Sequence, residues 1–209
     1  MMSRTTLQRL WTWLCRFRYR SGYGVHSPFA FRLITEVIHQ EWPYYAYTAL
    51  MLEEKKRAAR ESAEWLREPL RVKRLLFRLA NEVQADYLLD AGPSAASALY
   101  LQAARRKAHY RQVSSTDALS LPPEEPLHLL YLHDADHPKW VERAFHHYAS
   151  HALPRSLFIV EGIGYTAAMQ ALWQRMQQDD RVGITFDLFD VGLIFFDRRM
   201  NKQHYKVRF

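Results

Sequence analysis

The chain has 209 residues, of which 48% are hydrophobic and 24% charged, a composition typical of one globular α/β domain with a full core. With 29 basic and 22 acidic residues its net charge is +7, and this charge is compatible with binding an anionic partner such as nucleic acid. No run approaches the roughly 20 apolar residues of a membrane span. No signal peptide is evident, and we therefore expect a cytoplasmic protein.

Residues 1–68 are expected to form a helical extension packed on the core. Apolar residues at three- and four-residue steps predict an amphipathic helix over residues 4–20, whose arginines either face solvent or dock an anionic partner. Its single cysteine, Cys15, excludes an intramolecular disulfide, and we interpret it as an inert thiol. Ser27 and Pro28 predict the start of a second helix that runs towards His39. A charged helix is predicted over residues 48–67.

Residues 69–209 alternate between apolar runs and amphipathic helices, as in a βα domain. Pro69 begins a helix with one apolar stripe, which leads into the strand predicted at 87–90. We expect further helices over 94–107, after Pro138 and over 165–176. Further strands are predicted at 109–113, 127–133, 157–160, 182–189, 191–197 and 205–209. The short Phe189-Asp190 connection predicts an antiparallel hairpin at the edge of an open, mostly parallel sheet.

Three of these parallel strands end in an acid: Asp90, Asp134 and Glu161. Because the carboxyl ends of parallel strands share one rim, which is the usual ligand crevice, these acids are the first candidates for a site. Together with Asp136 they could bind a cation, or hold the hydroxyl and amine groups of a small cofactor. Alternatively they cap helices, as Asp136 would before Pro138. We expect no metal here.

Histidines lie close to these acids without forming a metal-binding pattern. His133 and His137 flank Asp134, but a surface position is expected for each. His147 and His151 have the i, i+4 spacing of one helix face, yet no third ligand is evident. The absence of GxSxG, HExxH and GxxxxGK[ST] motifs removes the common hydrolase and phosphate-loop functions.

Three stretches of the chain resemble a known family: residues 22–31 (GYGVHSPFAF), 75–81 (LLFRLAN), and 187–196 (DLFDVGLIFF) with 205–209 (YKVRF). The chain resembles class I S-adenosylmethionine-dependent methyltransferase-like proteins of the O-methyltransferase type, common in Bacteroidetes bacteria, over nearly its whole length. The resemblance implies a Rossmann-like methyltransferase fold, S-adenosylmethionine (SAM) as the cofactor, and a small molecule as the methyl acceptor.

The resemblance also implies the residues of the site. In the family, the first strand ends in an acid and a glycine-rich loop beside the methionine portion of the cofactor, and Asp90 and Gly92 match these positions. The later glycine of that loop is replaced here, around Ser94. The family's acid-Gly-Asn-His run is matched in part by residues 134–137. Asp90, Gly92, Ser94, Ser115 and Asp134 are the implied cofactor-binding residues, and Asp134 or His137 the implied base.

Two departures from the family predict a reduced cofactor site. Residues 114–126 are too few for a helix and the next strand, so one βα unit is missing. That unit usually supplies the acid for the ribose, where Ser114 and Ser115 stand instead. The paired aspartates that bind magnesium in metal-dependent relatives are replaced by Glu161-Gly162. Three functions stay open: an O-methyltransferase, a scaffold or binding protein that has lost the cofactor, and an RNA-associated protein that uses its basic residues (Arg4 to Arg20, Lys202, Lys206 and Arg208).

Overall fold

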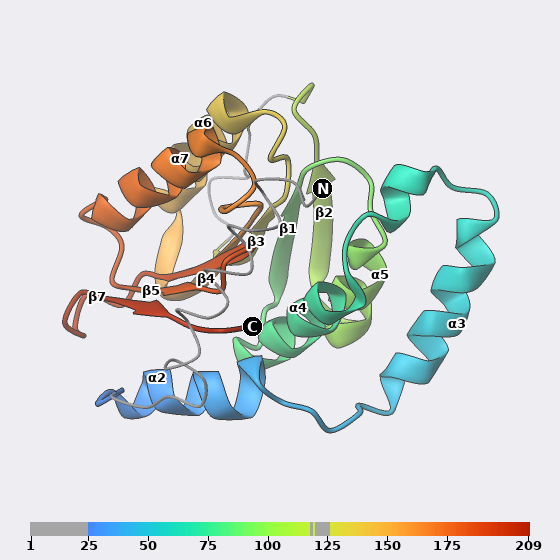
Figure 1. The fold of residues 1–209 in the computed structure, drawn as a ribbon, viewed down its shortest axis with the longest axis horizontal. Coiled ribbons are helices and arrows are strands. Elements are labelled where there is room, and N and C mark those ends of the chain that lie inside the picture. Colours follow the sequence, from blue (N-terminus) through green and yellow to red (C-terminus); the bar gives the residue numbers. More distant parts are fainter. Residues whose placement is uncertain (1–24, 118, 120–125) are drawn as a thin grey trace, which may run out of the picture.

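The computed structural model describes residues 25–117, 119 and 126–209, and its centre is a seven-stranded β-sheet (Figure 1). The strand order is β2-β1-β3-β4-β6-β5-β7. All strands run parallel except β6, which is antiparallel to its neighbours β4 and β5. The predicted open, mostly parallel sheet is confirmed. Its strands are β1 (Tyr87–Ala91), β2 (His109–Val113), β3 (Leu127–Leu132), β4 (Ala152–Glu161), β5 (Ile184–Asp187), β6 (Val191–Phe195) and β7 (Gln203–Lys206).

Helices cover both faces of the sheet, because successive strand residues point to opposite sides. Leu88 and Leu129 pack in one core cluster with the helices before β1, whereas Leu89 and Leu130 pack in a second cluster with α6 and α7. Figure 1 shows α6 and α7 on one side and α2 and α4 on the other. The described helices are α2 (Pro28–Arg32), η2 (Leu33–Ile38), α3 (Ala46–Ala58), η3 (Ala63–Leu66), α4 (Leu70–Glu82), α5 (Ser97–Ala104), α6 (Pro138–Ala149) and α7 (Ala167–Gln178).

The C-terminal hairpin exists, but its predicted place at the edge of the sheet is wrong. Strands β5 and β6 pair antiparallel, and β6 then pairs with β4 inside the sheet. The edge is β7, which runs parallel to β5 at Gln203–Lys206 and not at 205–209 as predicted. The short turn determines only that the two strands of the hairpin pair with each other. It does not determine which other strands lie beside the hairpin in the sheet.

The shortened segment after β2 has the predicted effect on the sheet. The described residues between β2 and β3 (114–117, 119 and 126) form no helix or strand. Within the part of the chain that the structure describes, β2 pairs with β1 alone and β3 lies directly on the other side of β1. The sheet therefore lacks the strand that a further βα unit would add beyond β2.

The N-terminal region is helical where it is described, with two helices in place of the one predicted over 48–67. Helix α3 ends at Ala58, and the 3₁₀-helix η3 starts after Ser62, whose side chain accepts a hydrogen bond from the amide of Trp65. Helix α3 is tied to α4 by a buried ion pair between Lys73 and Glu54. The helix predicted over 4–20, with Cys15, lies outside the described residues. The proposed boundary between residues 68 and 69 stays a prediction.

Two further boundaries differ from the sequence-based expectation. Helix α5 starts at Ser97 and not at residue 94, because the amide of Ala96 bonds the carbonyl of Trp65 at 2.9 Å and not a carbonyl of the same helix. Strand β4 is longer than the predicted 157–160 and begins at Ala152. Among the described helices, none has the length and the apolar character needed to cross a membrane. The cytoplasmic location stays a prediction.

Candidate functional site

A pocket of about 420 Å³ opens at the rim where β1, β2 and β3 end. Its volume lies within the range of small-molecule sites, and its place at the carboxyl ends of parallel strands is the usual one for an α/β sheet. Four of the six site residues that the resemblance implied line this rim pocket: Ser94, Ser115, Asp134 and His137. The fold thus brings together residues that lie up to 43 positions apart in the chain.

Asp90, by contrast, does not line the rim pocket. Its side chain is 1% exposed, and both carboxylate oxygens have partners within the protein. The hydroxyl of Tyr110 donates to Oδ2 at 2.5 Å, and Nε2 of His133 lies 2.6 Å from Oδ1. Asp90 is therefore a buried acceptor for two side chains of this chain, one of which, His133, itself lines the pocket.

Gly92 is also covered by His133. A Cβ added to Gly92 would lie 2.6 Å from two ring atoms of His133, far inside an ordinary van der Waals contact. The imidazole ring therefore occupies the space that glycine leaves open. The resemblance assigned that space to the methionine portion of the cofactor, so at Asp90 and Gly92 this chain fills it with its own side chain.

Two carboxylates and a tyrosine extend this arrangement into a buried cluster of Glu68, Tyr131, His133 and Glu161. The Tyr131 ring stacks on the His133 ring with centroids 4.4 Å apart and planes 5° apart. The Tyr131 hydroxyl lies 2.9 Å from Oε1 of Glu68 and also bonds Oε2 of Glu161. The other oxygen of Glu68 accepts a hydrogen bond from the amide of Ser97 at 2.9 Å, at the start of α5.

Burial and neighbouring charges shift the pKa values of this cluster. A hydroxyl has one hydrogen, so Tyr131 cannot donate to both carboxylates at once. Burial raises the pKa of Glu68, and the nearby charge of Glu161 raises it further. Burial lowers the pKa of His133, but the attraction of Asp90 and Glu68 outweighs burial and the net pKa is raised. The pKa values of Glu68 and His133 are therefore both shifted upwards, towards the protonated forms of these groups.

The cluster also has the donor set of a metal site. One ligand atom each of Glu68, His133 and Glu161 lies within 4.8 Å of the others. Other protein groups already engage these side chains, since the hydroxyl of Tyr131 lies within hydrogen-bond reach of both carboxylates and Nε2 of His133 contacts Asp90. The geometry is therefore that of a hydrogen-bonded network that joins β1, β3 and β4 to the segment between η3 and α4.

At the mouth of the rim pocket, Asp134 and His137 form a hydrogen-bonded pair. Nδ1 of His137 lies 2.8 Å from Oδ1 of Asp134, and the imidazole is largely exposed while the carboxylate is buried. The hydrogen bond to Asp134 and its negative charge raise the pKa of His137. Nearby, Nη1 of Arg67 lies 3.2 Å from Oδ2 of Asp136. The pocket therefore offers both signs of charge to a ligand.

Sequence reasoning missed several residues of this site. His133 was expected at the surface, and that expectation is wrong, because it is 2% exposed and forms the wall between Asp90 and the pocket. Its place at the end of a strongly apolar strand was the available signal. Glu68 and Arg67 reach the rim from a segment before α4, and no local pattern points to them.

Comparisons with known proteins agree with the fold. No family model matches the chain, and no curated protein does. The SAH-bound methyltransferase PaMTH1 of Podospora anserina is similar with a TM-score of 0.57 and 10% identity, over 94% of this chain and 97% of its own. The O-methyltransferase TomG of Streptomyces achromogenes, solved in complex with SAM, gives 0.53 and 15%, over 87% and 98%. Such likeness shows the fold: this chain has the Rossmann-like fold of SAM-dependent O-methyltransferases.

Proposed function

We propose that the chain binds SAM in the rim pocket and transfers its methyl group to an oxygen atom of a small molecule. The rim pocket carries the proposal. It lies at the ligand-binding edge of a methyltransferase fold and is lined by Ser94, Ser115, Asp134 and His137. Two proteins of similar fold were solved with SAM or SAH. A Bacteroidetes origin stays a prediction.

The residues that line the pocket fit the cofactor in a different way from the one the resemblance implied. The amino-acid end of SAM carries an ammonium and a carboxylate. Because Asp90 and Gly92 are used by His133, this end would be held by Asp134 and Arg67, which line the pocket with opposite charges. The hydroxyl of Ser115, two residues after β2, would hold the ribose, which its position in the pocket lining supports. When bound, SAM supplies an electrophilic methyl group.

The Asp134–His137 pair can act as the base that accepts the acceptor's proton. In this pair Nδ1 of His137 donates its hydrogen to the Asp134 carboxylate. The neutral imidazole therefore keeps its lone pair on Nε2. Nε2 can then take the proton of a hydroxyl group in the pocket. Asp134 orients the ring and stabilises the imidazolium that forms. The remaining contribution of the chain is to hold the two reactants close and aligned.

A second candidate function is a binding protein that no longer takes the cofactor. The observation that favours it is the position of His133, which engages Asp90 at 2.6 Å and covers Gly92. In this case Asp90, Gly92 and the buried cluster serve only the stability of the fold. The two candidates differ in one measurable property, the affinity for SAM.

Titration calorimetry with SAM and SAH on the full chain tests the proposal. We expect a dissociation constant in the micromolar range for both. Arg67→Ala should weaken the binding of SAM about tenfold, which is roughly 1.4 kcal/mol. It should leave the binding of 5′-methylthioadenosine unchanged, because this nucleoside has no carboxylate. The matched control is Arg106→Ala, an exposed arginine outside the rim pocket. No heat with millimolar SAM on folded protein would overturn the proposal in favour of the second candidate.

A further inference from the structure

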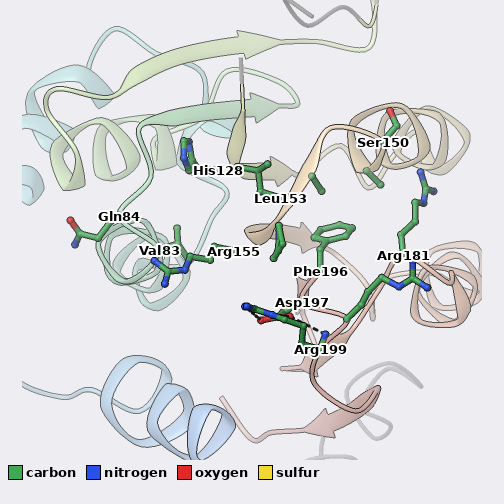
Figure 2. Close-up of a pocket in the computed structure, with 14 residues that line it drawn as sticks. Val83, Gln84, His128, Ser150, Leu153, Arg155, Arg181, Phe196, Asp197 and Arg199 are labelled. Atoms are coloured by element: carbon green, nitrogen blue, oxygen red, sulfur yellow. Dashed lines mark hydrogen bonds and ion pairs between the residues drawn. The ribbon is translucent and has the colours of Figure 1, made fainter. Parts of the chain in front are cut away.

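A second and larger cavity lies at the opposite end of the sheet. Its volume is about 1000 Å³. Its walls come from the end of α4, the starts of β3 and β4, the end of α6 and the segment that follows β6 (Figure 2). The starts of β3 and β4 are the amino ends of parallel strands, so this second cavity, the basic cavity, faces away from the rim pocket. The two share no lining residue.

Positive charge dominates the lining of the basic cavity. Four arginines, Arg155, Arg181, Arg198 and Arg199, stand against one acid, Asp197. Arg199 bonds Asp197 at 2.8 Å, so that pair is neutral. The hydrogen bond from Arg199 lowers the pKa of Asp197 to about 2, and the charge of Arg155 contributes to the same shift. Asp197 therefore stays ionised and uses up only one of the four positive charges.

Two of the arginines are available to a ligand. Arg155 and Arg198 are exposed, and the side chain of neither makes a hydrogen bond or ion pair with another of the residues that the structure describes. Arg181 is held in place by Asp179 at 2.7 Å, and Asp179 lies outside the lining. Guanidinium groups that are not already paired bind carboxylate, phosphate or sulfonate groups through two parallel hydrogen bonds.

Apolar side chains also contribute to the lining, beside the polar Gln84, His128 and Ser150. Figure 2 shows Leu153 and the ring of Phe196 in the middle of the cavity wall, with Asp197 and Arg199 beside them and Arg181 at one side. Leu153 lies near the start of β4 and is 39% exposed. Val83 adds a further apolar surface at the end of α4. The ring of Phe196 is mostly buried, so a ligand with an apolar body would chiefly remove the side chain of Leu153 from water.

We propose that the basic cavity binds a small organic anion, with its charged group on Arg155 and Arg198 and its apolar body against Leu153 and Phe196. An inorganic anion would match only the arginines and leave the apolar wall in water. A nucleic acid would need a track of cations along an open surface, whereas these four arginines line one cavity. The class of ligand is therefore an aromatic or acyl compound that carries a carboxylate, phosphate or sulfonate.

Fluorescence titration with 8-anilinonaphthalene-1-sulfonate, which combines an aromatic body with one sulfonate, tests the site. We expect saturable binding at one site per chain of the full-length protein. The double variant Arg155→Glu/Arg198→Glu should weaken binding at least tenfold, and Leu153→Asp should weaken it several-fold. The control with the same change in charge is Arg106→Glu/Lys107→Glu, at exposed positions outside the cavity. It should bind within twofold of the unchanged protein.

Three outcomes would overturn the proposal. The first is equal binding by the Arg155→Glu/Arg198→Glu variant when circular dichroism shows that it is folded. The second is non-saturating binding at several sites. The third is complete displacement of the dye by a single-stranded RNA at submicromolar concentration with a steep dependence on salt, which would assign the cavity to nucleic acid. Saturating SAM should leave the dye in place, so this site can fail or hold independently of the rim pocket.

Discussion

The close contact between Gly92 and His133 allows a test of whether the glycine is needed for packing or for ligand binding. In Gly92→Ala, the new methyl group would lie 2.6 Å from Cδ2 and Nε2 of His133 and 2.8 Å from Cε1. Ordinary contacts between such atoms are about 3.5–4.0 Å. The backbone at Gly92 is not in the left-handed region, so alanine itself is not strained there. Any loss of stability must come from the imidazole.

The size of the effect follows from how firmly His133 is held. Its Nε2 lies 2.6 Å from Asp90, and its ring stacks on Tyr131 with centroids 4.4 Å apart. The ring cannot turn away without giving up both contacts. Overpacking of a filled core typically costs about 1–3 kcal/mol, so we expect Gly92→Ala to lower the free energy of unfolding by about 2 kcal/mol. For a chain of this length that corresponds to roughly 4–8 °C in melting temperature.

Urea unfolding followed by circular dichroism measures this change, and a double-mutant cycle assigns it. In a His133→Ala background the ring is gone, so adding Gly92→Ala should cost less than about 0.5 kcal/mol. Ser94→Ala, an exposed position in the same loop, is the control and should change stability by no more than about 0.5 kcal/mol. Gly92→Ala as stable as the unchanged chain, with loss of SAM binding only, would refute this reasoning and assign the glycine to the ligand.

Two further predictions concern charged pairs. Asp134→Asn should lower the pKa of His137 in an NMR titration of the imidazole, because the hydrogen bond and charge of Asp134 raise it. Because the pKa of His137 is raised in the folded state, the pair stabilises the fold fully below pH 6.5, and this stabilisation is lost as pH rises through the pKa of folded His137. An NMR titration in which Asp134→Asn leaves the pKa of His137 unchanged would contradict the assigned cause. Lys73→Met leaves the mostly buried Glu54 without its cation and should cost about 3 kcal/mol in urea unfolding. A cost below about 1 kcal/mol would show that the ion pair contributes little, and Arg106→Met is the control, expected within about 0.5 kcal/mol of the unchanged chain.

Local patterns were sufficient to predict the core of the fold and half of the candidate site. The apolar periodicity of the strands is set by neighbouring residues, and the parallel order of βα units then brings residues such as Ser94 and Asp134 to one rim. Helix boundaries and strand neighbours were less predictable, because they depend on contacts such as Ala96 to Trp65 and β6 to β4.

The buried cluster could not have been predicted, because its contacts join distant parts of the chain. The hydroxyl of Tyr131 meets Glu68, 63 residues away in sequence, and Glu161, 30 residues away. From the sequence alone, Glu68 resembles the end of a charged helix. Only the fold brings its carboxylate beside Tyr131 of β3. Polar residues in apolar surroundings become informative only when their partners are known.

Strand β4 links the two ends of the sheet. It begins at Ala152, in the wall of the basic cavity, and ends at Glu161, in the buried cluster beside the rim. Its pairing with β3 slips between Ala152 and Leu157, so its ends are separated by about the length of the six-residue β3, roughly 20 Å at about 3.3 Å per residue. Substitutions so far apart generally have additive effects on stability. Natural variation or engineering can therefore rebuild the loops at one end of this strand for a new ligand without disturbing recognition at the other.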